Sequence, residues 1–333
     1  MPQMTSSQQP SVLVTGATGY IGSRLVPVLL DAGLRVRVLT RSADRLRARR
    51  WADDVEVVEG DATSRQDLDR ALEGIDVAYY LLHSMDGKDD FEQRDRDLAR
   101  TFGLAAQGAD VGRIVYLSGL HPDSGHLSPH LASRVEVGDL LMASGVPTVV
   151  LQAAIIIGSG SASFEMLRHL TRKLPVMVTP KWVNNRIQPI AIADILHYLV
   201  GAATVEGDVN RTFDVGGPEV LTYREMIQRF ARVAGLRERA IRTVPVLTPG
   251  LASHWVGLVT PVPSGIAKPL VGSLIHEVVC QEDDIDDVVG PPRGGKTGFD
   301  DAVRAALDGA KDRPEPGTVD PARLTAADPD WAG

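Results

Sequence analysis

Cysteine is nearly absent from this chain of 333 residues, because Cys280 is the only one. A lone cysteine excludes an internal disulfide and fits a reducing compartment, so we expect a cytoplasmic protein. Aromatic residues make up only 5% of the chain, which predicts a core of aliphatic side chains. The sequence also has no run of about 18 apolar residues, and this excludes a membrane-spanning helix.

The chain also lacks an excess of basic charge. The net charge is −8, and residues 281–333 hold nearly all of it, so the rest of the chain is close to neutral. A nucleic-acid-binding protein needs a basic surface, and we therefore expect no nucleic-acid partner. No metal site is assigned. Residues 1–10 are polar and carry no targeting pattern, so they are expected to form a flexible tail.

Three glycines mark the most informative stretch of the sequence. An apolar run, Val12–Val14, leads into Gly16, Gly19 and Gly22, and apolar residues then recur at helical spacing. This pattern predicts a strand, a tight turn and a helix. Gly16 permits the turn, Gly19 lets a pyrophosphate approach the backbone, and Gly22 permits close helix packing. The spacing is G-x-x-G-x-x-G, not the G-x-G-x-x-G of many dehydrogenases, but its context favours a dinucleotide site over a plain turn.

The end of the second predicted strand indicates which dinucleotide binds. Residues 35–40 form this strand, and Thr40, Arg41 and Ser42 follow in the place where an NAD site has an acidic residue. An acidic residue holds the ribose 2′-hydroxyl of NAD, whereas a cation accommodates the 2′-phosphate of NADP. Arg41 therefore favours NADP(H) over NAD(H). The alternative is that Arg41 belongs with Arg45 to a solvated basic segment.

Further strands alternate with helices down to residue 157, and this alternation predicts an α/β fold, a Rossmann-type doubly wound parallel sheet. Ligands of such sheets bind at the carboxyl ends of the strands. Asp61, Leu82, His83 and Ser118 all follow predicted strands. We expect a Rossmann domain over residues 11–157, a smaller and mostly helical substrate region over 158–313 that partly returns to the sheet, and a flexible or wrapping tail over 314–333.

The motifs 15–22, Gly60-Asp61 and 117–119 together resemble the short-chain dehydrogenase/reductase superfamily, and within it the atypical branch of NmrA-like and epimerase-like NAD(P)H-binding proteins. The resemblance covers roughly residues 11–235. It implies cofactor contacts at Thr18, Tyr20, Ile21, Arg41, Asp61, Ala62, Leu82 and His83.

Enzymes of this superfamily typically carry a Tyr-x-x-x-Lys pair on the helix after the fifth strand, and a serine at the position of Ser118 polarises the substrate. Here the matching segment is His130–Arg134, which has neither usual residue. Arg134 suits a role in holding ribose hydroxyls, although its permanent charge makes it unfit as a proton relay. His130 has an unperturbed pKa near 6.5 and suits a general acid. The alternative is that Ser128-Pro129-His130 is only a helix start.

A segment with an apolar face at Leu251, Trp255, Leu258 and Val259 lies between two prolines of the substrate region. Packing against a core is the favoured interpretation. A lid over a greasy substrate and a shallow contact with a membrane surface are the alternatives.

Two functions are consistent with the whole sequence. The first is an NADP-dependent oxidoreductase that reduces a small or lipophilic organic substrate without the usual Tyr-Lys pair. The second is a non-catalytic NADP(H)-binding sensor, regulator or assembly protein, which the missing pair favours. Neither the substrate nor the oligomeric state follows from the sequence.

Overall fold

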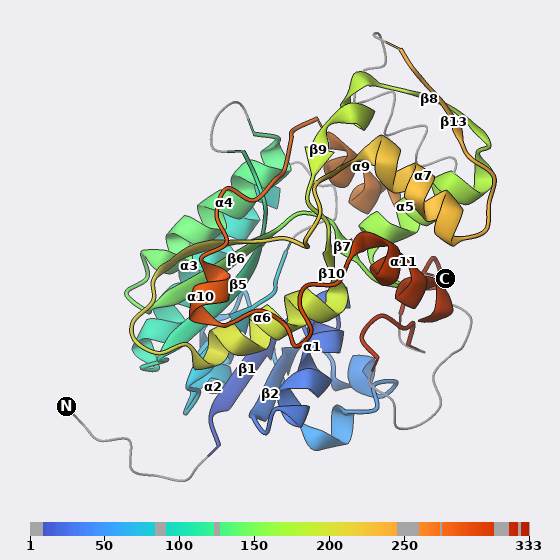
Figure 1. Ribbon diagram of the computed structural model, residues 1–333. Coiled ribbons are helices and arrows are strands. Elements are labelled where there is room, and N and C mark those ends of the chain that lie inside the picture. The colour runs from blue at the N-terminus through green and yellow to red at the C-terminus, as the bar shows by residue number, and fades with distance from the viewer. Residues whose placement is uncertain are drawn as a thin grey trace.

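The computed structural model describes residues 9–83, 91–122, 127–244, 260–273, 275–309, 320–325 and 328–332. Within these ranges a seven-stranded parallel sheet forms the centre, in the order β11-β6-β5-β4-β1-β2-β3 (Figure 1). Its strands are β1 (Ser11–Thr15), β2 (Arg35–Thr40), β3 (Glu56–Glu59), β4 (Val77–Tyr80), β5 (Arg113–Gly119), β6 (Thr148–Ala153) and β11 (Arg211–Val215). The predicted doubly wound sheet is confirmed, and its order reverses between β1 and β4, where ligands of such sheets bind.

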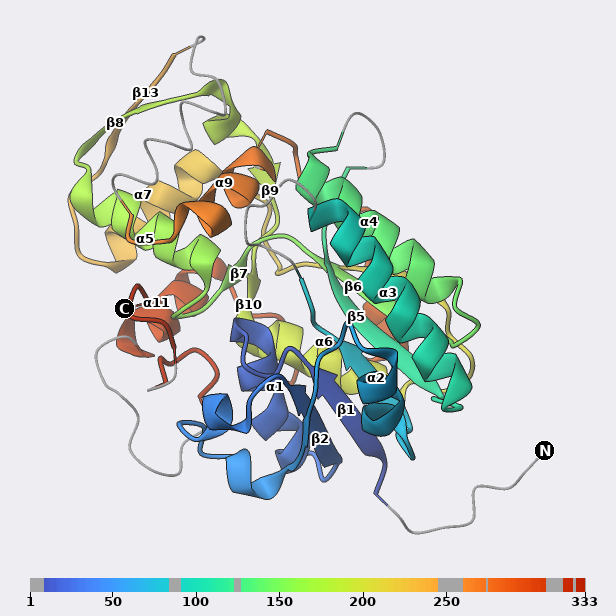
Figure 2. The ribbon, with the colours of Figure 1, turned by 180° about the vertical axis from the view of Figure 1, so that it is seen from behind.

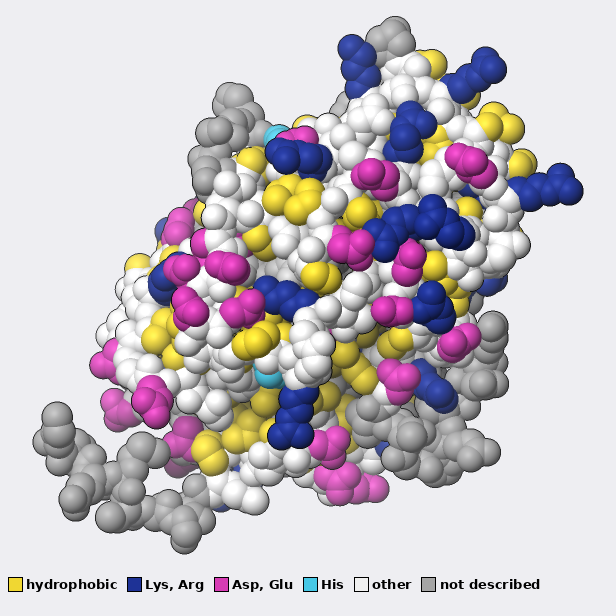
Figure 3. All heavy atoms as spheres, in the orientation of Figure 1, with side chains coloured by type: hydrophobic (Ala, Val, Ile, Leu, Met, Phe, Trp, Pro, Cys, Tyr) yellow, Lys and Arg dark blue, Asp and Glu magenta, His cyan; other side chains and the backbone are white. Residues whose placement is uncertain are grey.

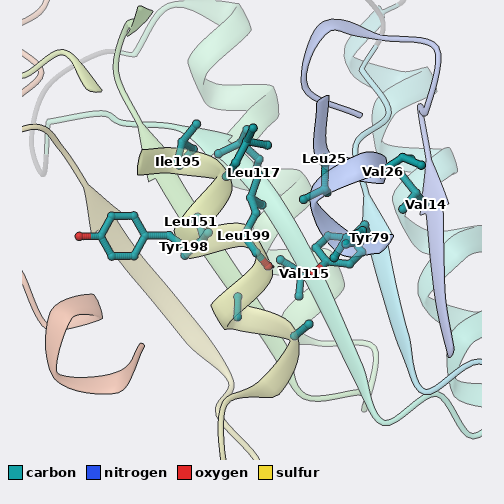
Figure 4. Close-up of a cluster of buried hydrophobic side chains, with 14 of the residues drawn as sticks. Val14, Leu25, Val26, Tyr79, Val115, Leu117, Leu151, Ile195, Tyr198 and Leu199 are labelled. Atoms are coloured by element: carbon teal, nitrogen blue, oxygen red, sulfur yellow. Dashed lines mark hydrogen bonds between the residues drawn. The ribbon is translucent and has the colours of Figure 1, made fainter. Parts of the chain in front are cut away.

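Helices cover both faces of the sheet because successive strand residues point to opposite sides. On one face lie α1 (Tyr20–Asp31) and α6 (Ile192–Thr204), which pack on Val12 and Val14 (Figure 4). On the other lie α2 (Arg65–Leu72), α3 (Phe91–Gly108) and α4 (Pro129–Met142), which pack on Leu13 (Figure 2). The core is mainly aliphatic, as predicted, although Tyr79, Tyr80, Tyr116 and Phe102 are also fully buried.

Local signals in the sequence account for several helix starts. The Ser128 hydroxyl accepts a hydrogen bond from the Leu131 backbone N–H, and Pro129 occupies the first turn of α4. A serine cap followed by proline satisfies one helix donor and removes another. The predicted helix start at residues 128–130 is therefore confirmed, and it places His130 in the first turn.

A second lobe follows β6 and rests on the carboxyl ends of the strands (Figures 1 and 2). Its core gathers around Phe164, Met226, Phe230 and Val303. Short strands accompany its helices, so this region is less purely helical than the sequence suggests. Its elements are β7 (Ile156–Ile157), α5 (Ala162–Lys173), β8 (Val176–Thr179), η3 (Lys181–Asn184), β9 (Arg186–Ile187), β10 (Ile190–Ala191), β12 (Leu221–Thr222), α7 (Tyr223–Val233), β13 (Ala240–Thr243), α9 (Ser264–Ser273) and α11 (Phe299–Gly309). Helix α10 (Ile285–Val288) packs instead on the first lobe, against β11 (Figure 1).

The described residues near the carboxyl terminus lie against the first lobe. Arg24 of α1 forms an ion pair with Asp328 at 2.9 Å and donates a hydrogen bond to the Pro321 carbonyl at 3.0 Å. Both charged side chains are buried, and the Ser159 backbone N–H donates to the Ala322 carbonyl at 3.2 Å. Residues 320–325 and 328 thus wrap over the start of α1 and tie it to the second lobe.

None of the described helices is both long enough and apolar enough to cross a membrane. The segment with the apolar face at Leu251, Trp255, Leu258 and Val259 lies outside the described residues. On the face shown in Figure 3, acidic and basic side chains are interspersed over both lobes.

Candidate functional site

A cleft of about 630 Å³ opens at the carboxyl ends of the strands on both sides of the β1/β4 switch point. The turn before α1, the ends of β2 and β3 and the residues after β4 form one side of it. Helix α3 forms the other side. Its lining residues include Gly16, Thr18, Arg41, Arg45, Asp61, Ala62, Thr63, Leu82, His83, Arg94, Asp97 and Thr101.

The glycine turn has the geometry of a phosphate cradle. Gly16 has a φ of +73°, and a Cβ atom there would lie 2.6 Å from the Leu81 carbonyl oxygen. A Cβ at Gly22 would lie 2.4 Å from the Gly16 oxygen, so Gly22 is required for the helix to pack against the turn. Gly19 is exposed and caps α1, and a Cβ there would meet only the Gly16 oxygen. Open space and unsatisfied N–H groups at a helix start suit a pyrophosphate.

Two arginines line the far end of this cleft. Arg41 and Arg45 have no ion pair or side-chain hydrogen bond to any described residue, and both are exposed. The Thr40 hydroxyl is already hydrogen-bonded within the chain, since it donates to the Ser42 carbonyl at 3.1 Å. Ser42 does not line the cleft. Two exposed guanidinium groups that form no ion pair with any described residue fit a phosphate better than a hydroxyl.

Asp61 follows the edge strand β3 and lines the same cleft as these arginines and the glycine turn. Its Oδ1 accepts hydrogen bonds from the Thr63 backbone N–H and hydroxyl, both at 2.9 Å. These bonds, and more weakly the nearby Arg41, hold the pKa of the Asp61 carboxyl below its usual range. Asp61 is therefore a fixed acceptor at neutral pH, as contact with an adenine amino group requires.

Tyr20 and Ile21 do not line the cleft with their side chains. The Tyr20 ring lies under the Arg24 guanidinium, 4.0 Å from its centroid, and only the backbone of this residue can face a phosphate. Sequence reasoning missed the contribution of α3, whose Arg94, Asp97 and Thr101 line the cleft. No local motif marks them, because they reach the site only through the packing of α3 beside α2 and α4.

A second, apolar cavity of about 480 Å³ lies between the lobes, and we call it the chamber. Its walls come from the ends of β5 and β6, the start of α4, and the second lobe. Most lining side chains are aliphatic, among them Leu120, Leu131, Met166, Leu167, Met177, Val183, Ile187 and Ile227. Trp182 and Tyr223 also line it, and the Trp182 Nε1 and Tyr223 Oη atoms are buried with no hydrogen-bond partner among the described residues.

Two histidines join the cleft to the chamber. His83 lines the cleft and His130 lines the chamber, and their Nε2 atoms are 2.9 Å apart. The Nδ1 atom of His83 is 3.1 Å from Oδ2 of Asp95 on α3, and the Ser133 hydroxyl donates to the same oxygen at 3.3 Å. Asp95 and Ser133 are both buried. His130 Nδ1 is buried as well and has no partner among the described residues.

Burial dominates the electrostatics of this histidine pair. Burial, and more weakly His83 and Arg134, lower the pKa of His130 to about 3, against an opposing effect of Asp95. Burial also lowers the pKa of His83, with Asp95 opposing the shift. Both imidazoles are therefore neutral at pH 7, and each carries one N–H donor and one bare nitrogen.

Ser118 and Arg134 lie beneath the histidines and line neither cavity. The Ser118 hydroxyl donates to the Arg134 carbonyl at 3.3 Å. The Arg134 Nη2 donates to the Leu117 carbonyl at 2.5 Å, and its guanidinium stands over the Tyr116 ring. Of the three predicted catalytic residues, only His130 reaches a cavity wall.

Comparisons with known proteins identify the family and the fold of the chain. A protein-family model described as NAD(P)H-binding matches residues 16–157. A (4-alkanoyl-5-oxo-2,5-dihydrofuran-3-yl)methyl phosphate reductase of Streptomyces griseus is 31% identical over 232 residues, which is 67% of this chain and 74% of that protein. A ceramide reductase of Caulobacter vibrioides is 29% identical over 80% of this chain and 84% of that protein. The structure of a Citrobacter sp. triphenylmethane reductase complexed with NADP(H) has a TM-score of 0.68 at 19% identity and covers 88% of this chain and 99% of its own, which shows the shared fold.

Proposed function

The chain belongs to the NAD(P)H-binding family of short-chain dehydrogenase/reductases, and from this premise we propose that it is an NADPH-dependent reductase of an apolar carbonyl or related substrate. The observation that carries the proposal is the pair of cavities. A polar cleft suited to a dinucleotide and an apolar chamber suited to a substrate are joined by the hydrogen-bonded histidines.

The residues of the cleft fit NADPH. The glycine turn and the start of α1 would hold the pyrophosphate, Asp61 the adenine amino group, and Arg41 and Arg45 the 2′-phosphate. When bound, the cofactor supplies a hydride, and the protein supplies position and a proton. The neighbouring relatives named as reductases support this chemistry.

The chamber suits a lipophilic molecule. Its volume of about 480 Å³ lies within the usual range for small-molecule sites, and its lining is mostly aliphatic. The Trp182 and Tyr223 donors, which have no partner among the described residues, favour a substrate that carries a hydrogen-bond acceptor away from its reacting carbon. One relative is named as a reductase of an alkanoyl furanone phosphate and another as a ceramide reductase. Both names are compatible with a substrate that has an acyl chain.

His130 is the residue that we place against the substrate, since it lines the chamber and sits at the position of the usual tyrosine. Arg134 and Ser118 line neither cavity, and we assign them a structural role. They fix the first turns of α4 to the end of β5, and Arg134 would reach ribose hydroxyls only by leaving the Leu117 carbonyl.

The proposal is tested by calorimetry and turnover. Purified protein should bind NADPH more tightly than NADH, and it should oxidise NADPH with long-chain ketones, enones or quinones as acceptors. His130→Gln should abolish turnover and leave NADPH affinity within about threefold. Tight NADPH binding with no turnover over a broad acceptor panel would instead favour the sensor or assembly function, and absence of binding would refute both.

A further inference from the structure

We propose that Asp95, His83 and His130 form a proton relay through the wall between the cleft and the chamber, with Asp95 as the positioning residue that sets the order of protons. This inference rests on the proposed reductase function and names the source of its proton. No motif in the sequence connects these three residues. His83 follows β4, Asp95 lies on α3 and His130 lies on α4.

The order of protons follows from the two distances at His83. An Asp95 carboxylate can only accept, so the Nδ1 atom of His83, 3.1 Å away, must carry the proton. In a neutral ring the Nε2 atom of His83 is then bare and accepts from the Nε2–H of His130 at 2.9 Å. His130 is left with a bare Nδ1, which is the buried atom without a partner.

Addition of one proton converts this resting relay into an acid. The extra proton makes His83 an imidazolium beside the Asp95 carboxylate, and its Nε2–H now donates to His130. His130 in turn carries its proton on Nδ1 and remains neutral. The positive charge therefore stays on His83, next to a buried negative charge, and never has to reside on His130.

The reaction step balances with NADPH as the reductant. A hydride adds to the carbonyl carbon, and the electron pair of the C=O π bond moves to oxygen. That oxygen takes the proton from His130 Nδ1, while His130 Nε2 takes the proton from His83 Nε2. The products are an alcohol and the relay in its resting form. A solvent proton taken up at the bare His130 Nδ1, as the Nε2–H of His130 passes to His83 Nε2, restores the acid.

The other ionisable groups near the two histidines either change the pKa of the imidazoles or remain neutral. Arg134 of α4 faces both rings and disfavours their protonation, whereas Asp95 favours it. The hydroxyls of Tyr80 and Tyr116 lie in the same electrostatic environment, but burial raises their pKa values, so they stay neutral. Arg94 lines the cleft on the same side as His83.

The first test needs neither substrate nor cofactor. In ¹⁵N NMR of histidine-labelled protein at pH 7.5, we expect His83 as the Nδ1–H tautomer and His130 as the Nε2–H tautomer, assigned with His83→Gln and His130→Gln. Asp95→Asn should lower the measured pKa of His83, because the charge that stabilises the imidazolium is gone. Ser133→Ala keeps that charge and should shift the pKa less. A proton on His130 Nδ1 at pH 7.5, or a His83 pKa that Asp95→Asn leaves unchanged, would overturn the relay.

The second test uses single turnover of the full chain with NADPH. Asp95→Asn should slow hydride transfer by about 100-fold, the usual scale of general acid catalysis, while NADPH affinity stays within about threefold. The native rate should fall about tenfold per pH unit above the pKa of His83, since one proton is required. His197→Gln, on α6 and bonded to the Gly290 carbonyl, is the matched control and should keep the native rate. A decrease in the single-turnover rate of less than threefold in Asp95→Asn would refute the relay. Absence of any turnover by the native chain would refute the reductase function. In that case the histidine tautomers measured by NMR would still test the proposed order of protons.

Discussion

Replacing Arg41 with serine should convert a preference for NADPH into near indifference between NADPH and NADH. Arg41 lines the cleft, has no ion pair to any described residue, and follows the strand end where an NAD site has a carboxylate. Its free guanidinium can therefore turn to a 2′-phosphate without first breaking another contact. NADH lacks this phosphate, so its affinity should change little.

The size of the effect can be worked out. A hydrogen bond to a charged group contributes about 1.5–3 kcal/mol, and the exposure of Arg41 places its contribution near the lower end. At about 1.4 kcal/mol per tenfold, the loss of about 1.5–2 kcal/mol predicts a 10- to 30-fold weaker Kd for NADPH. The double variant with Arg45→Ser should lose more, but less than the product of the two single effects, because both arginines serve one phosphate.

Calorimetry with both nucleotides at low and high salt measures this prediction. The difference between NADPH and NADH should shrink from about 0.05 M to 0.5 M salt, since screening shortens the reach of the charges. Arg47→Ser is the matched control, because Arg47 is 81% exposed and paired with Asp44 outside the cleft. Equal affinity of the native chain for the two nucleotides would refute the assignment, as would an equal loss for both in Arg41→Ser.

Three further predictions concern stability. In urea unfolding, Gly16→Ala should destabilise the fold by about 2 kcal/mol more than the control Gly74→Ala. Both sites have positive φ, but only at Gly16 would a Cβ lie against the Leu81 oxygen. Equal effects of the two substitutions would show that this close approach is unimportant. Asp328→Asn should cost about 2–3 kcal/mol, because it leaves Arg24 buried without a counterion, whereas Asp301→Asn in an exposed pair should cost less than about 0.5 kcal/mol. His130 should lower stability by about 1.6 kcal/mol from pH 6.5 to pH 5, because the unfolded chain takes up a proton there that the folded chain, with a pKa of about 3, does not. His169, whose pKa burial lowers to about 4, should add a similar loss. His130→Gln should therefore reduce the pH dependence by the His130 share, and an undiminished slope in this variant would contradict the lowered pKa.

The sequence brings several residues of the cleft together because the signals for them are local. Gly16, Arg41 and Asp61 each follow a strand of the same sheet, and parallel strands bring their carboxyl ends to one edge. The chamber and the relay are different. His83 and His130 are 47 residues apart, and Asp95 reaches His83 only because α3 packs against α4 in one register. No residue spacing encodes that contact, so the sequence predicted His83 as a cofactor contact and His130 as an acid without connecting them.

The apolar chamber also gives a physical reason for a histidine, His130, at the position where enzymes of the superfamily typically carry tyrosine. Burial raises the pKa of a tyrosine, as it does for Tyr80, Tyr116 and Tyr223 here, and so weakens it as an acid unless a cation stands beside it. The only nearby cation on α4 is Arg134, which is bound to the Leu117 carbonyl below the histidines. An imidazole chain avoids this difficulty, because His130 passes on a proton while neutral and the charge remains on His83 beside Asp95. Restoring the usual pair with His130→Tyr and Arg134→Lys should therefore give less than a tenth of the native single-turnover rate, and a rate equal to the native one would show that the chamber does not require the relay.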